Sequence, residues 1–163
     1  PTTYWPRKLF YFADQLVPYS VKMAEKPTPT QIIDQMIEKD AFSQWLDVKR
    51  EEEGPGYCRL SMEVKPSMLN GFGIAHGGIS FSLADSAFAF ASNSRGQHAV
   101  SIETSIAHHQ AVRAGDRLIA SAKEVFLGNK IGTYLVEVYQ QNNELVASFK
   151  GTVYRTSRAW ETI

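Results

Sequence analysis

The sequence predicts an α+β fold in which one long buried helix is followed by a meander of antiparallel strands. The helix is expected over residues 77–94, where alanine and phenylalanine fall on every side and an arginine and a glycine then end the pattern. Turn residues separate the strand patterns that follow, which span residues 99–109, 117–127, 131–140 and 145–155. With one or two strands ahead of the helix, this order predicts an antiparallel sheet wrapped around it.

An appendage and two helical segments are predicted ahead of the sheet. Residues 1–27 are rich in aromatic side chains and form an N-terminal appendage of unknown role, which leaves residues 28–163 as the domain. Thr28 is followed by a proline and, three residues after it, by a glutamine, a pattern typical of a capped helix start. A short second helix is expected around Trp45, and residues 51–56 are interpreted as a charged turn between strands.

Residues 57–65 alternate between apolar and polar side chains, which is the pattern of a half-buried strand. Cys58 lies on the apolar side of this strand, so a packed thiol is expected there rather than a nucleophile. Pro66 ends the strand, and a loop leads from it to His76. The residues that carry chemistry lie in that loop, in the long helix and in the strands after it.

Composition excludes several classes of protein. The 163 residues suit one domain, and the 17 basic and 17 acidic residues cancel without a long run of one sign, which argues against a nucleic-acid binder. One cysteine permits neither an internal disulfide nor a thiolate metal cluster, and the histidines are not spaced with carboxylates as zinc ligands are. No apolar run approaches the roughly 20 residues that span a bilayer. We therefore expect no metal site and no membrane segment, and the cysteine usage favours the cytoplasm.

One acid stands in the apolar stretch of the predicted helix. Apart from any protonated fraction of His76, Asp85 is the only residue between Ile74 and Ser94 that is charged at neutral pH, and no cation lies one helical turn away from it. A buried ionised carboxylate normally pairs or takes up a proton. Two interpretations remain open: Asp85 accepts hydrogen bonds in a structural role, or it stays reactive in a dry pocket as a nucleophile or general base.

A glycine pair begins the same helix. Gly77 and Gly78 let a substrate carbonyl approach backbone N–H groups at the helix end whose partial positive charge suits an oxyanion. Gly78 and Asp85 are seven residues apart, so they share a helix face but are separated by roughly 10 Å along the axis. A reacting carbonyl must lie about 3 Å from both groups. We therefore predict an obligate homodimer in which two antiparallel helices bring Asp85 of one copy opposite Gly78 of the other.

Three segments, residues 68–71, 76–78 and 82–94, resemble the hotdog-fold acyl-CoA thioesterases, in particular the PaaI-type group of the phenylacetate pathway. A weaker similarity extends from about residue 37 to residue 155. The resemblance implies a hotdog fold, in which an antiparallel sheet wraps around one long helix, and the hydrolysis of an acyl-CoA substrate without a cofactor. It also implies a dimer, often paired into a tetramer.

The resemblance assigns roles by position. Asp85 matches the catalytic carboxylate, and Gly78 matches the amide donor that polarises the thioester carbonyl. Asn70 and His76 match polar partners of the motif, although a turn or a loop-stabilising hydrogen bond also accounts for these residue types. Ser101, on the strand after the helix, matches a position that in some relatives orients the attacking water.

The resemblance also indicates where coenzyme A would bind. Gly77, Lys130, Gly132 and Thr133 are the residues expected to contact the coenzyme A part of the substrate, with Lys130 beside a phosphate. The family often has a proline-containing run before Gly-Asp, whereas residues 108–116 of this chain are His-His-Gln-Ala-Val-Arg-Ala-Gly-Asp. The nearby rim of the site is therefore expected to differ in shape.

Two other functions are compatible with a hotdog fold. A non-catalytic acyl-CoA sensor does not need a carboxylate at the thioester, so Asp85 argues against it, as does the lack of a basic DNA-reading helix at the N-terminus. A hotdog dehydratase needs a different arrangement of histidine and acid. The acyl group stays open, since Phe81, Phe88 and Phe90 could line an aromatic pocket or simply belong to the core.

Overall fold

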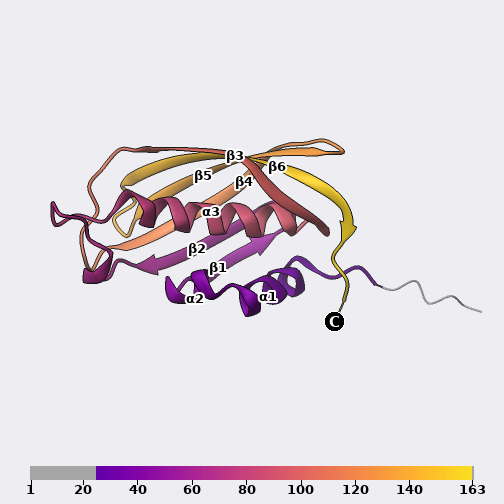
Figure 1. Cartoon of the computed structure of the whole chain (residues 1–163), viewed down its shortest axis with the longest axis horizontal. Helices are drawn as coiled ribbons and strands as arrows, with labels where there is room; N and C mark the ends of the chain where they lie inside the picture. Colours follow the sequence, from indigo (N-terminus) through magenta and orange to yellow (C-terminus); the bar gives the residue numbers. More distant parts are fainter. Residues whose placement is uncertain (1–24, 163) are drawn as a thin grey trace, which may run out of the picture.

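The computed structural model describes residues 25–162, and in that part of the chain one long helix lies across a six-stranded antiparallel sheet (Figure 1). Two shorter helices lie below the long one in that view. The helices are α1 (Pro29–Lys39), α2 (Ala41–Trp45), the short 3-10 helix η1 (Pro66–Met68) and α3 (Gly77–Asn93). The strands are β1 (Lys49–Gly54), β2 (Tyr57–Glu63), β3 (Gln97–His108), β4 (Arg117–Leu127), β5 (Ile131–Gln140) and β6 (Leu145–Ala159).

The strands follow the order β1-β2-β4-β5-β6-β3, and every neighbouring pair is antiparallel. This confirms the predicted α+β arrangement, with two strands ahead of the long helix. β3, the first strand after α3, lies at one edge of the sheet, and among the described strands it pairs only with β6. The predicted appendage lies outside the described residues up to residue 24. No helix among residues 25–162 is long and apolar enough to cross a membrane.

Aromatic packing holds α3 against the sheet. The Phe88 ring lies 5.7 Å from the ring of Tyr134 and 5.6 Å from that of Phe149. It also covers Gly151, where an added Cβ would lie 2.7 Å from the ring. Phe88 and Phe90 are both buried in the core, so neither lines a surface pocket, and Phe81 is half-buried against Phe149.

The expectation that α3 is buried on every side is wrong for one stripe. Gly78, Ser82, Asp85 and Ala89 follow one another at intervals of one turn, and all four remain at least partly exposed in the single chain. We call these four residues the open stripe of α3. Most other residues of the helix are buried, and α3 contacts the sheet and α1.

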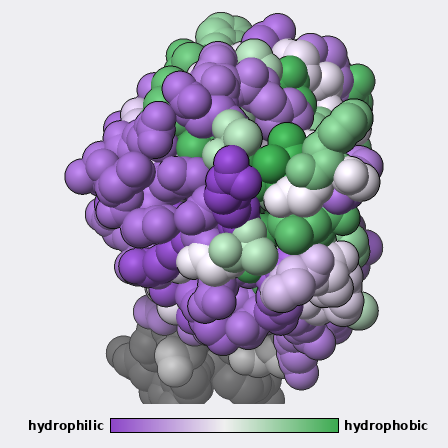
Figure 2. Space-filling model, turned by 90° about the vertical axis from the view of Figure 1, so that its left-hand side faces the viewer, coloured by the Kyte–Doolittle hydropathy of each residue, from purple (hydrophilic) through white to green (hydrophobic). Residues whose placement is uncertain are grey.

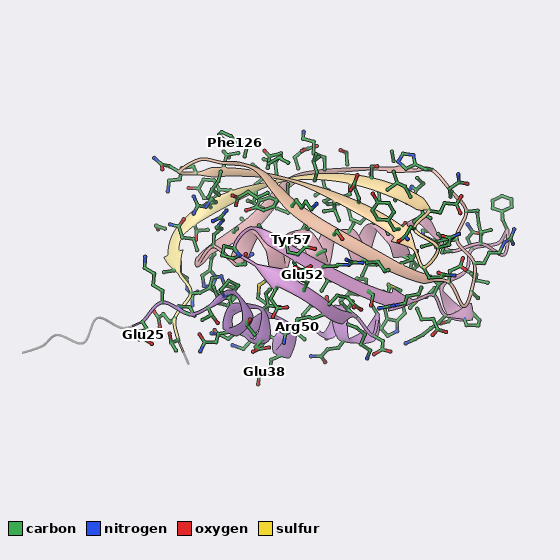
Figure 3. All side chains as sticks on the ribbon, turned by 180° about the vertical axis from the view of Figure 1, so that it is seen from behind. Glu25, Glu38, Arg50, Glu52, Tyr57 and Phe126 are labelled. Atoms are coloured by element: carbon green, nitrogen blue, oxygen red, sulfur yellow. The ribbon has the colours of Figure 1, made fainter. Side chains whose placement is uncertain are left out.

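The charged segment before β2 is a strand rather than the predicted turn, and only Pro55 and Gly56 turn the chain. Its residues are polar because β1 is an edge strand whose side chains pair with neighbours: Arg50 lies 2.8 Å from Asp34, and the Tyr57 hydroxyl donates to Glu52 over 3.1 Å (Figure 3). Charges on an edge strand also discourage pairing with other chains.

Two local predictions are confirmed. Thr28 and Gln31 form the reciprocal capping box at the start of α1. Cys58 is fully buried on the apolar face of β2. Burial raises the pKa of its thiol to about 12, which makes it a packing residue and not a nucleophile.

Candidate active site

The loop before α3 is fixed by its own hydrogen bonds. The Asn70 side chain accepts from the Phe72 N–H (2.8 Å), and its backbone N–H donates to the Ile74 carbonyl (2.8 Å). Gly73, at a φ of 72°, closes this turn in a conformation that glycine adopts easily. The turn presents Phe72, which is 91% exposed, at the end of the molecule. Asn70 therefore shapes the loop, as its residue type allowed.

His76 caps α3. Its ring Nδ1 accepts from the Gly78 N–H over 3.0 Å, and its backbone carbonyl accepts from the Ile79 N–H over 2.8 Å. The predicted oxyanion donor, Gly78, is thus engaged by a side chain of its own chain. The Gly77 N–H, at the first position of the helix, has no hydrogen-bond partner among the described residues.

A second imidazole contacts the other glycine. His108 ends β3, and its Nε2 lies 3.2 Å from the Gly77 carbonyl oxygen and 3.0 Å from the Ser80 hydroxyl. A Cβ added to Gly77 would lie 3.2 Å from this ring, and one added to Gly78 would lie 3.1 Å from His76. Both glycines therefore make room for histidine rings. Sequence reasoning missed His108, and the only signal for it was the departure from the family pattern at residue 108.

These groups meet at a cavity of about 180 Å³. Its wall is polar where Asn70, Ser80 and His108 contribute and apolar around Val112 and Val146. The full lining is Asn70, Ile74, Ala75, Gly77, Ser80, His108, Gln110, Ala111, Val112 and Val146. Figure 2 shows this end of the molecule from outside, with hydrophobic residues gathered on one side and hydrophilic residues on the other.

Asp85 does not line this cavity. It lies on the open stripe, two turns further along α3, and burial raises the pKa of its carboxyl group. Within the described part of the chain its carboxylate has no hydrogen bond and no ion pair to hold it in place. A half-buried carboxylate without a structural partner is typical of a functional site. One chain does not bring Asp85 and the glycine pair together.

Ser101 lies on the edge strand β3, opposite Val153 of β6. Cross-strand partners share a face of the sheet, and Val153 is buried on the face that α3 covers. Ser101 therefore lies on the same side of the sheet as α3. It is exposed, and no strand of the described part of the chain follows β3 at that edge.

The segment expected to contact coenzyme A lies toward the other end of α3. Glu124, near the end of β4, pairs with Arg95 just after α3 at 2.6 Å, and this places the β4–β5 turn near the C-terminal end of the helix (Figure 1). Lys130 in that turn lies 5.6 Å from the centre of the Tyr154 ring. Gly132 is buried, because an added Cβ would lie 3.2 Å from Tyr134, whereas Thr133 is half-buried.

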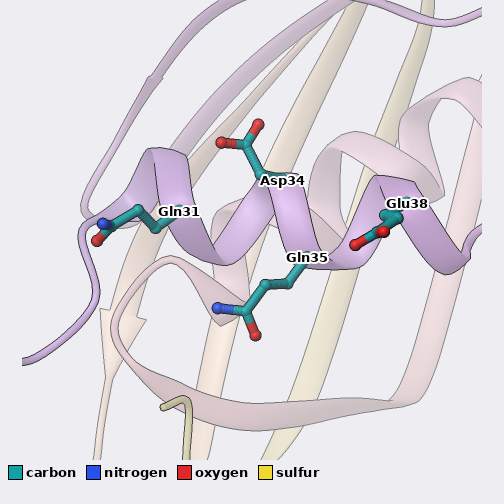
Figure 4. A pocket seen from close by; sticks show the side chains of 4 residues that line it. All are labelled: Gln31, Asp34, Gln35 and Glu38. Atoms are coloured by element: carbon teal, nitrogen blue, oxygen red, sulfur yellow. The ribbon is translucent and has the colours of Figure 1, made fainter. Parts of the chain in front are cut away.

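No group of three or more potential ligands suited to a metal ion occurs within residues 25–162. A second cavity, of about 380 Å³, lies over α1 (Figure 4). All four side chains that line it come from this helix: Gln31, Asp34, Gln35 and Glu38. It shares no residue with the loop, the glycine pair or the open stripe, so it is not a candidate for the predicted chemistry.

One long helix that lies across a six-stranded antiparallel sheet in the order β1-β2-β4-β5-β6-β3 is the arrangement of a hotdog fold. A family model described as thioesterase superfamily matches residues 72–147. The chain is 48% identical over 127 residues to a putative esterase of Archaeoglobus fulgidus, and the aligned region covers 78% of this chain and 82% of that protein. It is 38% identical over 120 residues to acyl-coenzyme A thioesterase PaaI of Escherichia coli, and this region covers 74% of this chain and 86% of that protein.

Solved structures agree with these matches. The Escherichia coli PaaI protein aligns with a TM-score of 0.79 and 36% identity over 80% of this chain and 95% of that one. An asparagine-to-aspartate variant of PaaI from Thermus thermophilus aligns with a TM-score of 0.69 and 42% identity over 72% and 100%. The chain therefore belongs to the thioesterase superfamily. It has the hotdog fold and is a thioester hydrolase.

Proposed function

We propose that the chain is an acyl-CoA thioesterase that acts as a homodimer, with each site built from both subunits. The observation that carries this proposal is the position of Asp85: half-buried, unpaired among the described residues, and on the one stripe of α3 that its own chain leaves open. A second α3, antiparallel to the first, would cover that stripe and bring its own N-terminus toward the carboxylate.

The proposed chemistry uses the thioester carbonyl. A backbone N–H at the start of α3 donates to the carbonyl oxygen and stabilises the negative charge that develops there. Asp85 of the facing subunit either attacks the carbonyl carbon, giving a mixed anhydride that water then hydrolyses, or takes a proton from the water that attacks. In both routes the carbon–sulfur bond breaks, and coenzyme A leaves as a thiolate that takes up a proton.

The donor is best assigned to Gly77. The Gly78 N–H already donates to His76, so its use would require that bond to break, whereas the Gly77 N–H has no partner among the described residues. Gly78 is then the residue whose engaged amide fixes the helix start, and Asn70 shapes the adjoining wall. His76 serves as the cap that leaves one amide free.

The edge strand β3 supports the homodimer. It runs for 12 residues, no strand within residues 25–162 pairs with its outer side, and Val100 and Ile102 on it are 53% and 56% exposed. A long unpaired edge is a template for another strand. Pairing β3 with its copy would also place Ser101 at the seam beside the open stripe. Assembly of two dimers into a tetramer stays a prediction, as does the cytoplasmic location.

The relatives support coenzyme A esters as substrates. A protein of Streptococcus mutans, 28% identical, was solved bound to acetyl-CoA, and a thioesterase of Streptococcus pneumoniae, 25% identical, was solved with coenzyme A. Two single variants of the Streptococcus pneumoniae protein were also solved, one with an aspartate and one with a threonine changed to alanine. These two positions are 16 residues apart. Asp85 and Ser101 have the same separation, so Ser101 corresponds by spacing to that threonine, and we assign it to orienting the attacking water.

The coenzyme A arm is assigned to the β4–β5 turn of the facing subunit. That turn lies toward the C-terminal end of α3, and antiparallel pairing of two helices would bring it toward the partner's Gly77. Lys130 then supplies a cation for a phosphate, and Thr133 a hydroxyl. Gly132, being buried, contributes by letting the strand pack closely.

The direct test is release of free thiol from a panel of aryl-acetyl, benzoyl and medium-chain CoA esters. Turnover of at least one ester supports the proposal. Binding of acyl-CoA without thiol release would instead identify a sensor, and hydration of an enoyl-CoA a dehydratase.

Subunit complementation tests the shared site. Gly77→Pro removes the N–H at the first helical position, where proline fits and where the extended ψ of 136° at His76 suits a following proline. We expect Asp85→Asn and Gly77→Pro each to be inactive as homodimers. Heterodimers of the two, isolated with two affinity tags, should regain about half of the wild-type activity because one of their two sites is intact.

Gly77→Ala is the matched control, since it adds a Cβ and keeps the N–H. An inactive heterodimer would place both groups in one subunit, and an active Gly77→Pro homodimer would remove Gly77 as the donor.

A further inference from the structure

The two imidazole rings at the start of α3 act on one peptide group, the one that joins Gly77 to Gly78. Its oxygen lies 3.2 Å from His108 Nε2 and accepts from the Ser80 hydroxyl over 3.2 Å, and its N–H donates to His76 Nδ1 over 3.0 Å. We propose that His108 is a positioning residue of the active site, which holds this peptide group so that the Gly77 N–H keeps its aim at the substrate. The proposal rests on the proposed function.

The need for such a clamp follows from the residue types. Two successive glycines have more backbone freedom than any other pair, so a helix start built on them does not hold its amides in place unaided. A donor for an oxyanion works when it is already oriented before the reaction. The glycines lack side chains, which makes room for the two rings but leaves the backbone flexible. Other contacts must therefore restrict this backbone.

The contacts around Gly77 remove that freedom on both sides. The peptide group before it is held by the His76 carbonyl, which accepts from the Ile79 N–H over 2.8 Å. The peptide group after it is held by His76, Ser80 and His108. The Gly77 N–H is then the one amide of this turn left without a partner among the described residues.

His108 comes from a part of the chain that is distant in sequence from Gly77 and is paired in the sheet. It lies 31 positions after Gly77 in the sequence. It is the last residue of β3 and is paired with Ala147 of β6. With its proton on Nε2 the ring donates to the Gly77 oxygen and shares that acceptor with Ser80. Because β3 is also the strand that would pair across the proposed dimer, the same strand fixes both the seam and the oxyanion donor.

Two variants separate the hydrogen-bond donor of the His108 ring from the shape of the ring. His108→Phe keeps a ring against Gly77 and removes the donor, whereas His108→Gln places an amide N–H near the position of Nε2. We expect His108→Phe to lower kcat about tenfold with KM little changed, since the lost contact acts in the transition state. His108→Gln should restore most of kcat.

His109→Phe is the matched control. His109 bonds to the Ser148 hydroxyl over 2.9 Å and makes no hydrogen bond to the glycine pair, so the variant should keep wild-type kcat and KM. An unchanged kcat in His108→Phe would overturn the proposal. A raised KM with unchanged kcat would overturn it as well, because that result makes His108 a substrate-binding residue.

A measurement without substrate separates this proposal from the proposed function. In protein labelled with 15N-glycine, the Gly78 amide should exchange with solvent several times faster in His108→Phe than in wild type, His108→Gln or His109→Phe. Equal exchange rates in all four proteins would overturn the clamp. If the wild type releases no thiol from any CoA ester, the proposed function fails, and the Gly78 exchange rates still decide whether His108 holds the peptide group.

Discussion

Replacing Asp85 by asparagine should abolish hydrolysis and at the same time stabilise the protein. The change keeps the shape of the side chain and removes the charge, which burial disfavours and which no described residue compensates. A structural acid behaves in the opposite way, because its loss breaks hydrogen bonds. The combination of lost activity and gained stability is therefore specific to a carboxylate retained for chemistry.

The size of both effects follows from the surroundings of Asp85. Loss of a nucleophile or general base costs about 10²-fold to 10⁴-fold in kcat. Burial penalises the charged form of Asp85, a penalty that the neutral asparagine does not carry. Because Asp85 is only half-buried, we expect Asp85→Asn to gain no more than about 1 kcal/mol in the free energy of unfolding at neutral pH.

The gain should depend on pH in a defined direction. Because the pKa of Asp85 is raised in the folded protein, the native state holds this proton to a higher pH than the unfolded chain does. The stability that this protonation contributes is complete below the ordinary aspartate pKa of about 4, and it is lost as the pH rises through the raised pKa. The advantage of Asp85→Asn should therefore be near zero at low pH and reach its maximum near neutrality.

Urea unfolding of both proteins, at equal and fixed subunit concentration, measures this difference. Taking the difference between wild type and variant at each pH cancels the other carboxylates, which titrate in both. The reasoning is refuted if Asp85→Asn is less stable than wild type at neutral pH, or if the difference does not change with pH. Hydrolysis by the variant at the wild-type rate would refute the catalytic role.

Two further predictions concern the core. Gly151→Ala should lower the free energy of unfolding by about 1–3 kcal/mol, because its Cβ would lie 2.7 Å from the Phe88 ring. Gly54→Ala is the control: its Cβ would have nothing within 4 Å, so it should change this free energy by less than about 0.5 kcal/mol. Equal effects of the two variants in urea unfolding would contradict this packing. Cys58, with its pKa raised to about 12, should not react with a thiol reagent at mildly alkaline pH until the protein is unfolded, and a stoichiometric reaction of the native protein would show that β2 opens.

The long helix, the strand order along the chain and the position of Asp85 could be predicted because they depend on local patterns. Alternation identified β2, and the apolar stretch with its glycine stop identified α3. The expectation of complete burial around α3 failed for the open stripe, because alanine and serine suit both a core and an interface. Only the three-dimensional covering of the helix separates the two cases.

The roles of the glycines could not be predicted from the sequence for a different reason. Spacing places Gly78 on the same helix face as Asp85, but it does not show that His76 folds back onto the Gly78 N–H. The position of His108 depends on β3 ending beside the start of α3, 31 residues away along the chain. The strand at β1 was missed because its charged residues have low strand propensity, and their partners, such as Asp34, come from another element.

The free-energy cost of ionising the half-buried Asp85 in a single chain is a reason why the proposed site needs two subunits. Burial alone keeps the proton on this carboxyl group to a higher pH, whereas a nucleophile or a general base acts only in its ionised form. In the proposed dimer the carboxylate faces the N-terminus of the partner's α3, where the free N–H of the partner's Gly77 and the helix dipole favour a negative charge by about 0.3–2 kcal/mol. The same amide that would stabilise the oxyanion would thus offset part of the cost of ionising the buried carboxylate, and the gain in stability expected for Asp85→Asn is what remains of that cost. Association then supplies what the fold of one chain lacks, and the half-buried charge on the open stripe becomes reactive only where its partner is present.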